Sequence, residues 1–173
     1  RTESPKPCFA PIYTPAGELV TEYRPADHPW HTGLYFGWVF ANNSNLWGGP
    51  WYLPDKGNYE MVSGTHGVQR HVEFLRLDPE DDGVVAEERL SWLDREDNII
   101  AVETRTYEIS PIADPSAYCW HLQTRIKAIG CTLTLGSSRK SHYSGLELRM
   151  GPPFADARHR NSEGAVGHES IMG

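Results

Sequence analysis

A two-residue alternation of apolar and polar side chains runs from Val68 to Leu135 and constrains the fold more than any other feature. It recurs in "VQRHVEFLRL", "VVAEERLSWL", "IIAVETRTYEI" and "YCWHLQTRIKAI", and the polar segments "DPEDDG" and "DREDN" separate the first three of these. A period of two is typical of a β-strand with one buried face, and the separators have the composition of turns. Together with "CTLTLGSS", the pattern predicts four or five strands in an antiparallel meander, with helical periodicity nearly absent.

The first 65 residues are of a different kind, because proline, glycine and tryptophan are frequent there. Proline excludes long helices and central strands, so we expect loops there, with "LYFGWVFA" as one short apolar strand. The tail from Gly151 to Gly173 is again irregular. We therefore expect a single all-β domain over residues 1–173, an antiparallel β-sandwich with long decorated loops. The start without Met and the apolar ending "HESIMG" favour a fragment of a longer chain.

Charge and composition exclude several classes of function. The net charge is -7 and the Lys and Arg residues are scattered, so we expect no nucleic-acid partner. No apolar run approaches the roughly 20 residues that span a bilayer, so we expect no membrane partner. Three cysteines without a C-x-x-C pair indicate a reducing, cytoplasmic setting. A small sugar-like molecule remains the expected ligand, and self-association into a homo-oligomer stays open.

The stretch "DHPWH" is the strongest candidate for a site. Pro29 prevents an ordinary helix through His28, so His28 and His31 lie on a turn and their imidazoles can converge. Two imidazoles can transfer protons near neutral pH or bind a divalent metal, with Asp27 as a further ligand or as the group that fixes one tautomer. The structural alternative is a turn capped by Asp and His, in which Trp30 fills the sheet edge.

Two further groups of residues are candidates. His66 precedes Gly67 at the start of a predicted strand, where it is either a catalytic group or a half-exposed polar residue. The segment "NLWGGPWY" places Trp47 and Trp51 around a Gly-Gly-Pro turn, and flat apolar rings with one polar edge suit the faces of sugars. We expect both indoles to bind substrate, whereas Trp38 belongs to the core.

Charged pairs on the strands have two explanations. Glu103 and Arg105 are two residues apart, so they share one face of a strand. Cross-strand ion pairs on the outer face explain them without chemistry. On a concave, loop-covered face, the same pair, together with Arg149 on a later strand, becomes a substrate clamp.

Several segments together resemble the bacterial PmoA-like family of uncharacterised proteins. They are "PIYTPAGELVTEYRPADHPWHTGLYFGW", "LWGGP", "ERLSWLD", "ETRTYEI" and "SGLELRMGPPF" leading to "ESIMG", in this order over nearly the whole chain. Family members often carry two adjacent histidines where this chain has Trp30 and His31, and they are usually longer at both ends. The family label refers to methane oxygenase, but that subunit is a membrane protein and this chain has no span.

The meander is also similar to the galactose-mutarotase-like supersandwich. This resemblance implies a carbohydrate on a concave sheet, and acid/base chemistry by a histidine and a carboxylate. Our first hypothesis is a carbohydrate-active protein, such as an epimerase, mutarotase or lyase-like enzyme, with His28, His31 and His66 as acid/base groups. One alternative is a metal-dependent enzyme, of oxidative or other chemistry, that uses His28, His31 and a carboxylate such as Asp27. The other is a non-catalytic binding module or partner subunit.

Overall fold

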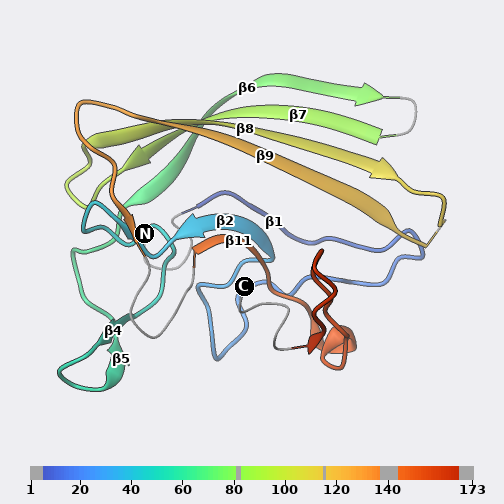
Figure 1. The fold of residues 1–173 in the computed structure, drawn as a ribbon, viewed down its shortest axis with the longest axis horizontal. Helices are drawn as coiled ribbons and strands as arrows, with labels where there is room; N and C mark the ends of the chain where they lie inside the picture. The colour runs from blue at the N-terminus through green and yellow to red at the C-terminus, as the bar shows by residue number, and fades with distance from the viewer. Residues whose placement is uncertain (1–5, 81–82, 115, 137–143, 168–173) are drawn as a thin grey trace.

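The regular secondary structure of the protein consists almost entirely of β-strands (Figure 1), as a computed structural model shows for residues 6–80, 83–114, 116–136 and 144–167. The strands are β1 (Cys8–Phe9), β2 (Leu34–Trp38), β3 (Phe40–Ala41), β4 (Trp51–Leu53), β5 (Asn58–Glu60), β6 (Val68–Glu80), β7 (Gly83–Leu93), β8 (Ile99–Pro111), β9 (Tyr118–Ala128), β10 (Leu135–Gly136) and β11 (Ser144–Leu148). A 3-10 turn, η1 (Pro152–Phe154), follows, and these residues contain no α-helix. The predicted all-β, antiparallel, sandwich-like fold is confirmed.

The predicted meander forms the larger sheet, with strand order β6-β7-β8-β9 and antiparallel pairing throughout. Its turns follow from local chemistry. Between β7 and β8, the Asp94 carboxylate accepts hydrogen bonds from the backbone N–H of Glu96 at 2.8 Å and of Asn98 at 2.9 Å. Such a side-chain turn explains why "DREDN" interrupts the alternation where it does.

Two details differ from the prediction. β6 does not alternate strictly, because its register against β7 shifts between His71 and Glu73 and again between Phe74 and Arg76. Each shift places an extra residue in one strand and turns the following side chains to the other face. The expected fifth strand is also not part of the meander: Leu135 and Gly136 form β10, which pairs with β3. The end of that expected strand, residues 137–138, lies outside the described residues.

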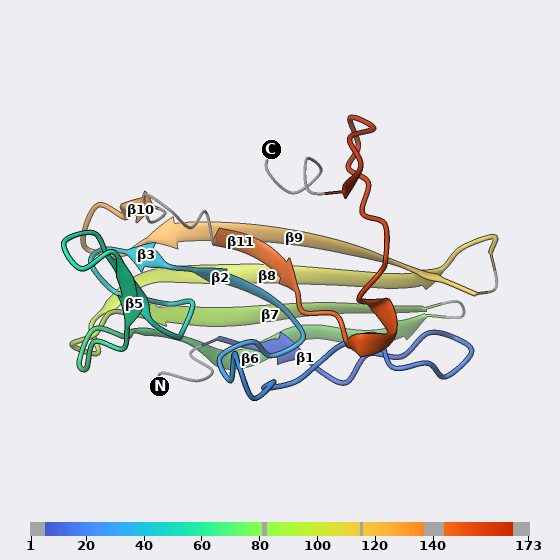
Figure 2. The same cartoon turned by 90° about the horizontal axis from the view of Figure 1, so that it is seen from below.

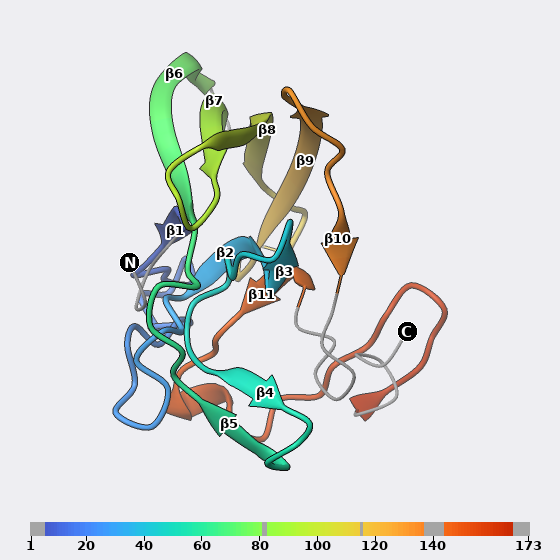
Figure 3. The same ribbon diagram turned by 90° about the vertical axis from the view of Figure 1, so that its left-hand side faces the viewer.

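A smaller sheet with strand order β1-β2-β11 covers one face of the meander. Figure 3 shows these two layers, and Figure 2 shows β2 and β11 lying in front of the long strands. The predicted strand "LYFGWVFA" becomes β2 and β3, separated at Val39. The β4–β5 hairpin lies on the side of the smaller sheet that faces away from the meander (Figures 1 and 3). Among the described residues, no helix is long and apolar enough to cross a membrane.

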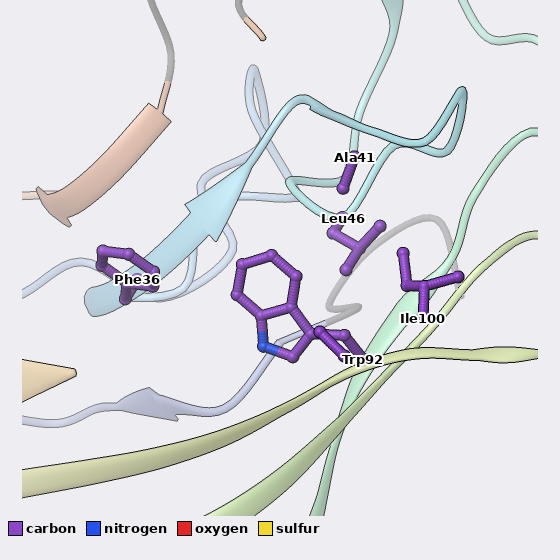
Figure 4. Packing of buried hydrophobic residues seen from close by; sticks show 6 residues of the cluster. Phe36, Ala41, Leu46, Trp92 and Ile100 are labelled. Atoms are coloured by element: carbon purple, nitrogen blue, oxygen red, sulfur yellow. The ribbon is translucent and has the colours of Figure 1, made fainter. Parts of the chain in front are cut away.

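The core lies between the two layers. Phe36 of β2, Leu46 and Trp92 pack together with Ala41, Ile100 and Ala101 (Figure 4). Adjacent residues of a strand point to opposite faces, so Tyr35 lies on the other side of β2. There it packs with Val39 and Trp47 in a second buried cluster. This second cluster supports the loops that carry "DHPWH" and "LWGGP".

Candidate functional site

The "DHPWH" loop is folded by two short backbone turns. The N–H of His28 donates to the carbonyl of Pro25 at 3.0 Å, and the N–H of His31 donates to the carbonyl of His28 at 2.9 Å. These turns bring the two imidazole rings to a centroid distance of 5.1 Å. Gly33 then leads into β2 with φ +84°, and a Cβ there would lie 2.4 Å from the carbonyl oxygen of Phe9. Glycine is therefore required where the loop joins the strand.

His28 and His31 both line a pocket of about 210 Å³, here named the His31 pocket. Its other lining residues are Trp30, Val39, Trp47, Gly48, Pro50, Tyr52 and Tyr59. Trp47 is buried beneath the pocket, whereas Tyr59 is 42% exposed on the β4–β5 hairpin. The Tyr52 and Tyr59 rings meet edge to face, with centroids 5.1 Å apart. The pocket thus has aromatic walls and contains two imidazoles.

Asp27 orients His28. Its carboxylate lies 2.7 Å from Nδ1 of His28, and this hydrogen bond, the largest of several causes, lowers the pKa of Asp27. Arg149 extends the chain of charges, with its guanidinium 3.7 Å from Asp27 and 3.3 Å from Glu22. With Asp27 ionised, Nδ1 of His28 carries a proton, which leaves Nε2 as the acceptor of the neutral ring.

His31 differs from His28 in its electrostatic surroundings. Burial lowers the pKa of His31 to about 4, and the positive charges of Arg149 and Lys6, and that of His28 when it is protonated, act in the same direction. His31 is therefore neutral at pH 7, and its ring offers one N–H donor and one acceptor nitrogen.

The "LWGGP" wall of the pocket is fixed from behind by residues that sequence reasoning overlooked. The buried Asn45 side chain accepts hydrogen bonds from the N–H groups of Trp47 and Gly48, both at 2.9 Å. Trp30 packs across Gly49, where a Cβ would lie 2.5 Å from the indole. The only available signal for Asn45 was its position directly before "LWGG", in a segment that favours turns.

His66 and Trp51 lie outside the pocket lining. His66 is buried, and its Nε2 is 2.8 Å from the carbonyl oxygen of Gly49. Within the described part of the chain, its Nδ1 has no hydrogen-bond partner. The indole N–H of Trp51 donates to the Thr65 hydroxyl at 2.7 Å. The structure therefore places both residues in the scaffold of the Gly-Gly-Pro turn. Trp47 lines the pocket, and its role in substrate binding stays a prediction.

Glu103 and Arg105 form a separate cluster inside the long sheet, so the expected outer-face ion pair is wrong. Arg105 is 1% exposed and donates to Glu103 through Nε at 2.6 Å and through a terminal nitrogen at 2.9 Å. Glu103 also accepts from the Trp92 indole and the Thr124 hydroxyl, both at 2.6 Å. Alternation fixed which residues share a face, but not which face is buried. The pair does not line the His31 pocket.

The metal-ligand hypothesis has a limited basis in the geometry. Within the described ranges, no group of three His, Cys, Asp or Glu side chains is arranged to hold a metal ion. His28, His31 and Asp27 are close together, but Asp27 is engaged by His28 and Arg149.

Fold and site together define a β-sandwich protein with an aromatic, two-histidine pocket. The chain belongs to the family of unknown function DUF6807, which matches residues 1–173. Comparisons with curated proteins and with solved structures find no match.

Proposed function

We propose that the His31 pocket binds a single sugar-like ring and that His28 and His31 catalyse a proton-transfer isomerisation of it, as an epimerase or mutarotase does. The observation that carries this proposal is the pair of imidazoles, one held by Asp27 and one kept neutral by burial, in a single pocket. Pockets for drug-sized ligands measure roughly 300–1,000 Å³. The His31 pocket, at about 210 Å³, suits a smaller, single-ring molecule.

The chemistry follows from the two environments. Nε2 of His28 takes a proton from a ligand hydroxyl, and the Asp27 carboxylate stabilises the imidazolium that forms. The neutral His31 donates a hydrogen bond to the ring oxygen on which negative charge develops as the ring opens. The proton held by His28 then passes to that oxygen. Rotation about the bond next to the new carbonyl and reversal of these steps close the ring on its other face, so the product is the other anomer and both histidines return to their initial state.

The aromatic walls supply binding. Tyr52, Tyr59 and Trp30 present rings to the pocket, and rings of this kind pack against the apolar faces of sugars. A reducing, cytoplasmic setting is part of the same proposal, because Cys8, Cys119 and Cys131 are all free thiols.

The test is a fluorescence titration of the purified protein with a panel of monosaccharides and glycosides. Trp30 and Trp47 line the pocket, so a bound ring should shift the emission. His31→Gln should weaken binding about tenfold or more, because the more flexible amide does not hold its donor and acceptor in the positions of the half-buried imidazole nitrogens. The matched control is His121→Gln, since His121 is exposed on β9 and pairs with Glu108 at 3.3 Å.

Turnover is measured on each ligand that binds, by the rate at which its anomers or epimers interconvert. Binding without turnover would favour the non-catalytic binding module. The assignment of this pocket would be contradicted if no monosaccharide or glycoside of the panel shifts the emission. It would also be contradicted if binding survives both His28→Gln and His31→Gln.

A further inference from the structure

Lys6 is a charged residue in the interior that the proposed chemistry does not use. It lies two residues before the start of β1 and is only 3% exposed. Its ammonium donates hydrogen bonds to the backbone carbonyls of Trp30, at 3.3 Å, and of Trp47. Trp30 and Trp47 stand on the two different loops that wall the His31 pocket. One side chain from a distant part of the sequence therefore ties both walls together.

The surroundings of Lys6 offset only part of the cost of burying its ammonium. The ammonium lies 4.1 Å from the centre of the Tyr35 ring and 5.6 Å from the Trp47 ring, where cation–π attraction offsets part of the lost hydration. Gly37 leaves room for the aliphatic stem, since a Cβ there would lie 2.9 Å from Cδ of Lys6. Burial lowers the pKa of Lys6 to about 7, and interactions with Cys8 and Glu147 act in the opposite direction. Burial in turn raises the pKa of Glu147 to about 7.

We infer that Lys6 is a positioning residue of the His31 pocket, which fixes the two walls against each other and sets the electrostatic environment of His31. Only the expected consequence for ligand binding rests on the proposed function. The charged or titratable groups that act on His31 are Lys6, Asp27, His28 and Arg149. Lys6 is the one among them that also holds the pocket backbone through hydrogen bonds.

The experiment compares Lys6→Met, Lys6→Gln and Lys6→Arg with Lys127→Met, a control on the exposed face of β9. The ring signals of His31 are followed by NMR as a function of pH, without any ligand. Removal of the nearby positive charge should move the His31 midpoint upward by about half a pH unit in Lys6→Met and Lys6→Gln. Lys6→Arg should keep the midpoint near that of the native protein, and Lys127→Met should not change it.

Ligand binding is the second readout, for any sugar that the native protein binds. Lys6→Met should weaken binding about tenfold, because the two walls lose the hydrogen bonds that Lys6 makes to both of them. Lys6→Arg should retain most of the binding affinity. If the midpoint of the His31 titration shifts but no sugar of the panel binds, the proposed function is contradicted and the role of Lys6 is supported. An unchanged midpoint in a folded Lys6→Met or Lys6→Gln protein would overturn that role. If neither variant folds whereas Lys6→Arg does, Lys6 serves global stability and the inference is also overturned.

Discussion

The Glu103–Arg105 cluster and the His31 pocket both place ionisable groups in the interior, but they differ in what surrounds these groups. In the sheet cluster, Arg105 and Glu103 satisfy each other and the remaining acceptor positions meet Trp92 and Thr124. In the pocket, His28 and His31 face an open volume between aromatic walls. Because the Glu103 carboxylate is fully engaged by these four hydrogen bonds, we assign the sheet cluster to the architecture and the proposed chemistry to the pocket.

The largest expected effect on stability comes from a substitution that breaks the Glu103–Arg105 cluster. Arg105→Met removes the positive partner and leaves the Glu103 carboxylate buried without its counter-charge. Breaking a buried ion pair in this way costs about 3–5 kcal/mol, so the free energy of unfolding in denaturant should fall by that amount. Arg125→Met, on the exposed face of β9, is the control. A loss below about 1 kcal/mol, the range of surface pairs, would show that the cluster is not structural.

A smaller effect is expected from the His31 pocket, in the pH dependence of the free energy of unfolding. The pKa of His31 is about 4 in the folded protein and 6.5 ordinarily, so between these values the unfolded chain binds more protons. The free energy of unfolding should therefore fall as the pH drops from about 6.5 to 4, by at most about 3 kcal/mol from this group. His31→Gln should lack this component. Denaturant unfolding of the native protein and of His31→Gln at pH 7 and pH 4.5 measures this component. Equal losses of unfolding free energy in the two proteins would contradict it.

The smallest effect on stability concerns Asp27. The side chains of Asp27 and His28 are 64% and 44% exposed, so Asp27→Asn should leave the melting temperature almost unchanged. The same substitution removes the acceptor that fixes the His28 tautomer, so ligand turnover should fall while ligand binding changes less. Nitrogen NMR of the imidazole reports the tautomer directly. A large drop in melting temperature would instead make Asp27 a structural cap of the turn.

Much of the sheet could be predicted from the sequence because strand signals are local. Alternation and turn composition located β7, β8 and β9 closely, and Asp94 shows why the separating turn lies where it does. The bulges in β6 were not predictable, because a bulge depends on how the strand pairs with its neighbour. The sequence of β6 alone does not specify this pairing. The orientation of Arg105 was missed for a related reason: periodicity does not say which face another layer will cover.

The site was predictable in part. Pro29 and the flanking histidines indicated a convergent turn, and the structure brings His28 and His31 to one pocket with Asp27 beside them. Lys6 was not predictable, because a lone lysine between two prolines carries no signal of burial. Its contacts depend on segments about 24 and 41 residues away, which only the folded chain brings together.

The two bulges of β6 also affect how the protein behaves in concentrated solution. β6 is an edge strand, and it exposes Phe74 at 52% and Leu77 at 58%. A flat edge with such side chains is a template on which other chains can add strands and aggregate. The bulges twist this edge and interrupt the regular spacing of its free N–H and C=O groups, while Arg70 and Arg76 add charge. The irregularity that periodicity could not predict therefore protects the sheet against edge-to-edge aggregation.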